Sequence, residues 1–165
     1  MMSTKTNALR EMIKAPVIPV VTIEDPAHAE PLARTLVEAG LPAIEVTLRT
    51  DRALHAMEII ARSVPEAILI AGTVVAASQI GEAIDAGAQA IVTPGTTPRL
   101  ADALAGARVP VMPGCATASE AMALAERGFE ILKFFPAGPS GGPAWLKGIA
   151  GPLPDLRFCP TGGVD

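Results

Sequence analysis

Short apolar runs rich in valine and isoleucine recur along the chain, and alanine-rich segments separate them. The runs occupy residues 17–21, 44–48, 68–74, 91–95, 109–114, 131–137 and 157–163. Their starts lie roughly 18 to 27 residues apart, which leaves room for one strand and one helix in each interval. Between the runs, apolar side chains recur with helical spacing, as in Leu54, Met57 and Ile60. Strands that alternate with helices form a parallel sheet, so the pattern predicts an α/β fold.

Three stretches of the chain share one layout. They read EAGLPAIEVT, DAGAQAIVTP and ERGFEILKFF, and each has a glycine (Gly40, Gly87 or Gly128) three residues before the point where we expect the next strand to begin. Glycine in this place ends a helix in the left-handed conformation. The repetition favours a series of βα units, and we expect a (β/α)8 TIM barrel. A doubly wound sheet is the alternative, although no GxGxxG motif follows the first run.

The number of expected strands is one short of a closed barrel. Seven runs are present, and the chain stops at Asp165, just beyond the seventh. A closed barrel needs one more strand, because an unpaired parallel edge is prone to misassociation. We therefore expect a single βα-barrel domain over residues 1–165 that holds strands one to seven. Either the chain is a fragment, or its barrel is completed differently.

Composition narrows the functional classes. The 165 residues, half of them hydrophobic, suffice for one domain with a core. A net charge of −4 gives no basic surface, so we expect neither nucleic acid nor an anionic membrane as a partner. No apolar run reaches the ~18 residues of a membrane span, and the N-terminus has no signal-peptide core.

Cysteine and histidine are scarce. Cys115 and Cys159 form no CxxC pair, and His28 and His55 are the only histidines. This set is too small for a structural zinc site, so we expect no metal. Two cysteines without a disulfide framework fit a reducing, cytoplasmic location.

The second expected strand carries polar side chains on one face. In IEVTLRT, residues alternate between faces, so Glu45, Thr47 and Arg49 lie together and Val46 and Leu48 lie opposite. Because apolar side chains should face the helices, the polar three should point into the barrel. Buried charges are costly unless they are paired or functional. The structural alternative is a Glu45–Arg49 ion pair that only neutralises itself.

A lysine interrupts the sixth expected strand, ILKFFPA. Lys133 shares a face with Ile131 and Phe135, and lysine is seldom buried without a partner. Desolvation and a nearby cation such as Arg49 would favour the neutral amine, which is the nucleophile. The alternative is an edge-strand lysine whose amine reaches water. The strand is apolar on both faces, which favours a central position.

The ends of the other strands add polar groups and sharp turns at the end of the barrel where active sites lie. Thr73 ends the third strand, and a hydroxyl there suits a carboxylate. Pro94 ends the fourth, because proline cannot donate to a strand ladder, and should shape a pocket. After the seventh strand come Thr161, Gly162 and Gly163. Exposed amides at such a junction favour a phosphate.

These motifs together resemble a known family. EVTLRT, AGTV, TPG, MPG, KFFPA and RFCPTGG occur in this order and nearly at the family's spacing. The chain is similar to the 2-keto-3-deoxy-6-phosphogluconate aldolases, also called 4-hydroxy-2-oxoglutarate aldolases, over almost its whole length. The resemblance implies a class I aldolase barrel and a cytoplasmic homotrimer of the Entner–Doudoroff pathway. It implies no metal or other cofactor.

The resemblance also implies roles for individual residues. Lys133 would form the Schiff base with a small 2-keto acid, and Glu45 would be the general acid and base, working through water. Arg49 and Thr73 would hold the carboxylate of pyruvate. The pocket would be completed by Thr47, Pro94, Phe135 and Thr161, and the phosphate would bind Gly162 and Gly163. In the family, an eighth strand supplies a further phosphate-binding element.

Alternatives remain for both the substrate and the function. The substrate is either 2-keto-3-deoxy-6-phosphogluconate, its galactonate epimer, or the unphosphorylated 4-hydroxy-2-oxoglutarate. The lack of an eighth strand motivates a second hypothesis, an inactive barrel that binds keto acid without turnover. A phosphate-binding isomerase barrel, which would not need Lys133, is a third.

Overall fold

The computed structural model describes residues 4–12 and 15–163 of the chain. The helices are α1 (Thr4–Met12), η1 (Pro26–His28), α2 (Ala29–Glu38), α3 (Ala53–Ser63), α4 (Ser78–Asp85), α5 (Pro98–Ala105), α6 (Ala118–Ala125) and α7 (Gly142–Ala150). The strands are β1 (Val20–Val21), β2 (Ala43–Thr47), β3 (Ile68–Gly72), β4 (Ala90–Val92), β5 (Val111–Met112), β6 (Gly114–Cys115), β7 (Ile131–Phe134) and β8 (Arg157–Pro160).

Every strand pair is parallel, as the alternating pattern predicted. The strands follow the chain in order as β1-β2-β3-β4-β5 and β6-β7-β8. Strands β5 and β6 come from one apolar run, which Pro113 divides because proline has no N–H for a ladder. The seven predicted strands are therefore present, with the fifth in two pieces and several shorter than expected.

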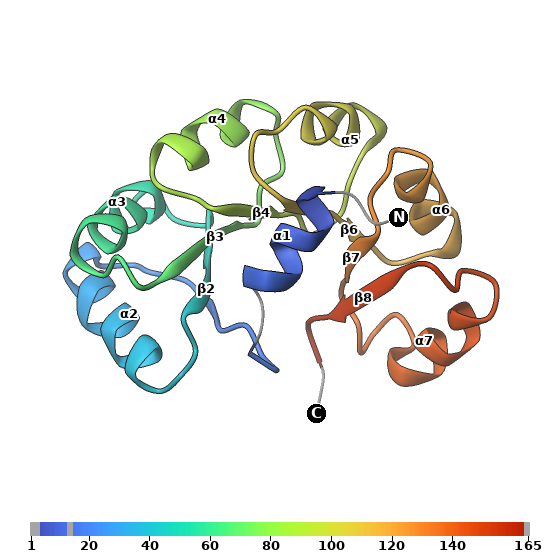
Figure 1. Cartoon of the computed structure of the whole chain (residues 1–165), viewed down its shortest axis with the longest axis horizontal. Helices are drawn as coiled ribbons and strands as arrows, with labels where there is room; N and C mark the ends of the chain where they lie inside the picture. Colours follow the sequence, from blue (N-terminus) through green and yellow to red (C-terminus); the bar gives the residue numbers. More distant parts are fainter. Residues whose placement is uncertain (1–3, 13–14, 164–165) are drawn as a thin grey trace.

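Helices α2 to α7 lie outside the strands in an incomplete ring (Figure 1). The outward side chains of the strands pack on these helices, among them Ile44, Val46 and Leu132. The inward side chains form a second cluster that includes Ala43, Ile70, Ala90, Val92 and Met112. Alternation along each strand thus divides the core into an outer and an inner layer, which is the architecture of a βα barrel.

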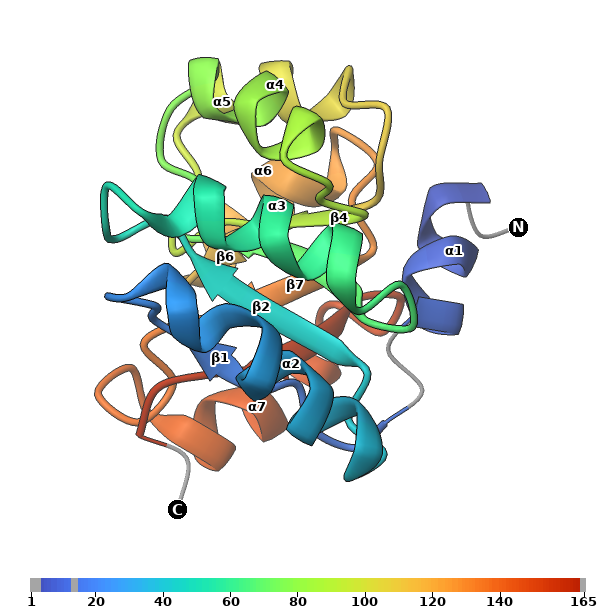
Figure 2. The same ribbon diagram turned by 90° about the vertical axis from the view of Figure 1, so that its left-hand side faces the viewer.

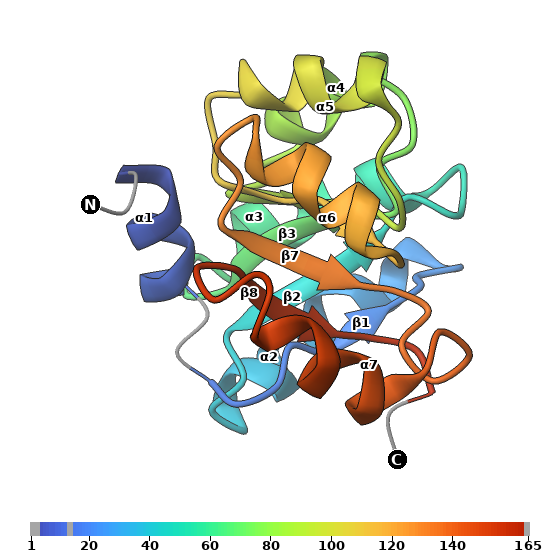
Figure 3. The same cartoon turned by 90° about the vertical axis from the view of Figure 1, so that its right-hand side faces the viewer.

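Helix α1, which the sequence pattern did not indicate, covers the end of the barrel where the strands begin (Figures 2 and 3). Its Leu9 is 2% exposed and belongs to the inner cluster. The opposite end, where the strands finish, is called the mouth below.

The three repeated stretches fold as predicted. Gly40, Gly87 and Gly128 have φ angles of 81°, 98° and 85°, which side chains with a Cβ rarely adopt. The strands that follow begin three residues later, at Ala43, Ala90 and Ile131. The repeat in the sequence is therefore a repeat of helix end, turn and strand.

The two sheets finish at β1 and β8, and no pairing within the described ranges joins these strands. Between them lies a cavity of about 760 Å³, called the seam below; its lining includes Val20, Glu45, Arg157, Cys159, Thr161 and Gly162. No helix in residues 4–12 or 15–163 has the length and apolar character needed to cross a membrane.

Candidate active site

Lys133 and Glu45 form an ion pair inside the barrel. Nζ of Lys133 donates to Oε1 of Glu45 over 2.9 Å, and the two residues are 4% and 3% exposed. Lys133 lies in β7, between β6 and β8, and its backbone N–H donates to the carbonyl of Pro113. The edge-strand alternative for this lysine is therefore wrong, because the strand is central and the amine points inward.

The partner of Glu45 also differs from the structural alternative. Glu45 pairs with Lys133 and not with Arg49. Strands β2 and β7 are not neighbours in either sheet, so the contact crosses the interior. The Lys133 amine also lies 5.5 Å from the centre of the Phe135 ring, which covers it on one side. The side chains of Lys133 and Glu45 are therefore almost fully buried, although Glu45 also lines the seam.

The expectation that Arg49 points into the barrel from the second strand is wrong. Strand β2 ends at Thr47, so the alternation of faces stops before Arg49, which is exposed in the following turn. Its Nε donates to Oγ1 of Thr73 over 3.2 Å. Thr73 has a φ of 59°, an unusual conformation for a β-branched residue that is often found at functional sites. Arg49 and Thr73 thus meet at the mouth.

Two buried threonines lie where strands β2 and β4 finish, at the mouth. Thr47 is fully buried, and its hydroxyl lies 2.8 Å from that of Thr22 in the loop after β1. Thr93, which the motifs above do not include, accepts a bond from the N–H of Gly114 and also contacts the hydroxyl of Thr96. Its position directly before Pro94, where the fourth run ends, was the available signal. Pro94 is half-buried, and a Cβ at Gly114 would meet its backbone.

The segment after β8 folds against the segment after β7. The carbonyls of Thr161 and Gly162 accept bonds from the N–H groups of Ala137 and Gly138. Gly162 and Gly163 have φ angles of 86° and 69°. A Cβ at Gly162 would lie 3.1 Å from the Phe135 ring, so glycine is needed here for both backbone and space. The expected phosphate-binding residues Gly162 and Gly163 line the seam together with Thr161, an expected pocket residue.

The cysteines have the character of core residues. Burial, together with the charge of Glu120, raises the pKa of Cys115 to about 12. Burial and then the charge of Glu45 raise the pKa of Cys159. Both thiols are protonated at neutral pH, which makes them poor nucleophiles. The described ranges contain no cluster of three or more histidine, cysteine or acidic residues suited to a metal.

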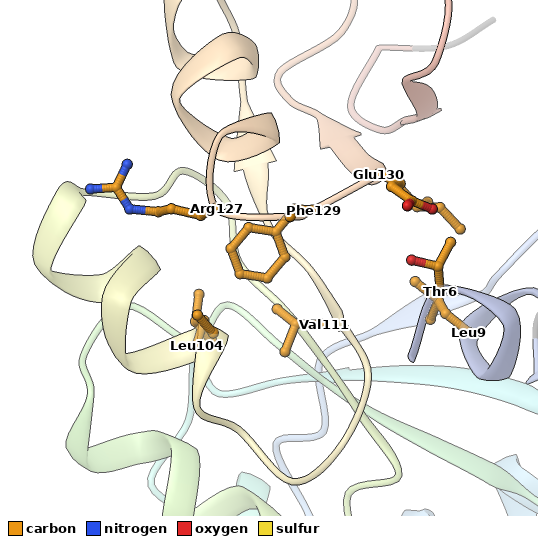
Figure 4. A pocket seen from close by; sticks show the side chains of 10 residues that line it. Thr6, Leu9, Leu104, Val111, Arg127, Phe129 and Glu130 are labelled. Atoms are coloured by element: carbon orange, nitrogen blue, oxygen red, sulfur yellow. The ribbon is translucent and has the colours of Figure 1, made fainter. Parts of the chain in front are cut away.

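A second cavity, of about 190 Å³, lies at the opposite end of the barrel (Figure 4). Thr6 and Leu9 of α1 line one side, and Arg127, Phe129 and Glu130 line others. Oε2 of Glu130 is buried there with no hydrogen-bond partner. This cavity lies at the beginning of the strands and is separate from the lysine–glutamate pair.

The barrel thus holds a buried lysine that is hydrogen-bonded to a carboxylate. A lyase that binds a carbonyl substrate covalently through an amine needs these two groups. The sequence model of the family described as KDPG and KHG aldolase, where KDPG is 2-keto-3-deoxy-6-phosphogluconate and KHG is 4-hydroxy-2-oxoglutarate, matches residues 9–165. The chain belongs to this family and is an aldolase, a carbon–carbon lyase.

Similar proteins agree with this assignment. The KHG/KDPG aldolase of Escherichia coli K12 is 44% identical over 164 residues, which are 99% of this chain and 77% of that protein. The crystal structure of the KDPG aldolase of Zymomonas mobilis ZM4 with 3-phosphoglycerate superposes with a TM-score of 0.93 at 41% identity, covering 98% of this chain and 77% of that one. The Legionella pneumophila KDPG aldolase, with pyruvate captured at low pH as a covalent carbinolamine, gives a TM-score of 0.89 at 41% identity over 91% and 73%.

Proposed function

We propose that this chain is a class I aldolase that cleaves KDPG to pyruvate and glyceraldehyde 3-phosphate, with Lys133 as the Schiff-base residue. The observation that carries the proposal is the buried contact of Lys133 with Glu45. The covalent carbinolamine of pyruvate in the similar L. pneumophila enzyme supports it. The chemistry follows from the positions of these two side chains.

Glu45 first serves as the base for the amine. Transfer of a proton from the Lys133 ammonium to Glu45 leaves two neutral groups, so no net charge is created in the interior. The amine then attacks C2 of the keto acid and forms a carbinolamine. Glu45 returns the proton to the departing hydroxyl, water leaves, and a protonated imine remains on Lys133.

Cleavage uses the same carboxylate, directly or through a water molecule. Glu45 takes the proton of the C4 hydroxyl, the C3–C4 bond breaks, and its electron pair moves toward the iminium nitrogen. Glyceraldehyde 3-phosphate leaves and an enamine remains. Glu45 protonates C3 of the enamine, and water hydrolyses the imine to release pyruvate and restore Lys133. General acid–base help of this kind is worth about 10²–10⁴-fold in rate.

The remaining residues would bind and orient the substrate. The guanidinium of Arg49 and the hydroxyl of Thr73, which meet at the mouth, would hold the carboxylate, since a planar fork matches its two oxygens. Phe135, Thr161, Thr47 and Pro94 would wall the pocket.

The phosphate would lie at Gly162 and Gly163. Both glycines hold the left-handed conformation beside the seam, where successive backbone amides suit an anion. This arrangement favours a phosphorylated substrate.

The substrate is tested by direct comparison. Pyruvate release is followed by a coupled lactate dehydrogenase assay with KDPG, the 6-phosphogalactonate epimer and 4-hydroxy-2-oxoglutarate. We expect the largest kcat/KM with KDPG, because the other two differ in stereochemistry or lack the phosphate. A higher kcat/KM with 4-hydroxy-2-oxoglutarate would replace KDPG as the substrate.

The alternative candidate function is a barrel that binds keto acid on Lys133 without turnover. The two functions separate in one experiment. An inactive binder retains pyruvate on Lys133 but releases none from KDPG, whereas sustained release by this chain excludes the inactive form.

We further propose that the chain works as a homotrimer in the cytoplasm, within the Entner–Doudoroff pathway, as its family resemblance implies. The resemblance also implies that it needs no metal. Sedimentation velocity tests the assembly, and a single species with the mass of one chain would contradict it.

A further inference from the structure

Gly72 lies directly beneath the carboxylate of Glu45. An ideal Cβ built on Gly72 would lie 2.5 Å from Cγ and 2.7 Å from Cδ of Glu45, and nearer still to Oε1. All three of its nearest atoms belong to this one side chain. The Glu45 carboxylate therefore occupies the space that a side chain at position 72 would fill.

The register of the strands explains why this space matters. Glu45 is paired with Ile70, and Gly72 is paired with Thr47, one inward position nearer the mouth. The Glu45 side chain thus leans across β3 toward the mouth. From there Oε1 reaches the amine of Lys133, which comes from β7 on another part of the wall.

The backbone at this position does not itself require glycine. Gly72 has no positive φ angle, so alanine fits the strand conformation. A methyl group would collide with a side chain that can rotate, and the barrel can keep its fold while Glu45 turns away. The expected damage is to the placement of the carboxylate.

We infer that Gly72 is a positioning residue for the reaction and holds Glu45 against Lys133 by offering it space. The inference rests on the proposed role of Glu45 as acid and base. The sequence alone does not single out Gly72, because a glycine near a strand end has many explanations.

The test begins with Gly72→Ala in the full chain. We expect kcat for pyruvate release to fall about 100-fold, within the range for acid–base catalysis, while KM changes little because Arg49 and Thr73 remain. The matched control is Gly81→Ala in α4, where an added Cβ meets nothing within 4 Å. It should keep wild-type kcat.

A double-mutant cycle with Glu45→Ala separates positioning from a general structural role. With Glu45 removed, adding Gly72→Ala should lower neither kcat nor the urea midpoint further. An equal loss in both backgrounds, a rise in KM in both, or wild-type kcat for Gly72→Ala would each overturn the inference. The urea midpoints measure stability, so they test the Gly72–Glu45 contact independently of catalytic turnover. Absence of pyruvate trapping on wild-type Lys133 would instead overturn the proposed function.

Discussion

Nζ of Lys133 lies 2.9 Å from Oε1 of Glu45, although 88 positions separate the two residues along the chain. Both are almost fully buried, so each charge depends on the other. Local sequence cannot create this contact, because the curvature of the sheets brings β2 and β7 to face one another. The proposed chemistry and a measurable part of the stability both depend on it.

Replacement of Lys133 alone should destabilise the chain strongly. Lys133→Met leaves the Glu45 carboxylate buried without its cation, and we expect a loss of about 3–5 kcal/mol in the free energy of unfolding. Adding Glu45→Gln should recover much of this loss, since the charge is then gone. Urea denaturation measures both, with Lys147→Met on exposed α7 as the matched control. Equal stability of the single and double variants would show that the pair is not coupled.

Arg49→Lys should weaken substrate binding more than it slows the chemistry. A lysine ammonium lacks the planar fork and cannot reproduce both the contact with Thr73 and a paired contact with a carboxylate. We expect KM for KDPG to rise about 10-fold, which corresponds to ~1.4 kcal/mol, with a smaller change in kcat. Steady-state kinetics measure this, with exposed Arg52→Lys as the control. A large fall in kcat at constant KM would assign Arg49 to the chemical step.

The thiol of Cys115 should resist alkylation in the folded chain. Its pKa of about 12, against an ordinary 9.0, lowers the thiolate fraction at neutral pH about 1,000-fold. Iodoacetamide labelling followed by mass spectrometry should therefore modify Cys115 at least this much more slowly in buffer than in concentrated urea. Labelling at similar rates in both would show that the thiol is accessible and ionised.

The N-terminus of α6 should contribute a pH-dependent stability. Thr117 and Glu120 form a capping box, and the backbone N–H of Ala116, followed by bonds from Thr117, lowers the pKa of the mostly exposed Glu120 below 4.5. The ionised form is thus favoured in the folded state, so its contribution is complete above the unfolded pKa and is lost as pH falls through the lower folded pKa. Thr117→Ala should cost about 1 kcal/mol at neutral pH.

This cost is measured by urea denaturation at neutral and acid pH. The difference between wild type and Thr117→Ala should shrink at acid pH, where Glu120 is protonated and the box is weakened in both chains. A difference that is equal at both pH values would remove Glu120 from the box.

The spacing of apolar residues and the glycines at the helix ends were enough to predict the barrel. Alternation placed Glu45 and Thr47 inside, and the glycines at the helix ends marked where strands begin. The pattern did not indicate α1, because the core that receives Leu9 is assembled from distant strands. It also did not indicate the split of the fifth strand at Pro113.

The site was predictable in its residues and less so in its pairings. Lys133 was singled out because a lysine in an apolar strand needs a reason. That Glu45 works beside it followed from the family resemblance, because the strand pattern alone does not show which strands face one another. Arg49 was misplaced because alternation was extended beyond the end of β2, where a turn sends the side chain to Thr73. Thr93 and Gly72 were not assigned roles, since a lone hydroxyl or glycine has many structural explanations.

The central claim is that the amine of Lys133 condenses with a 2-keto acid. The chain is incubated with pyruvate and borohydride, digested, and mapped by tandem mass spectrometry, with Lys133→Met and Lys147→Met treated in parallel. Schiff-base formation at Lys133 predicts one reduced pyruvate adduct on this residue, present in wild type and Lys147→Met and absent from Lys133→Met. Unmodified Lys133 in a folded sample, or an adduct spread over exposed lysines, would contradict it.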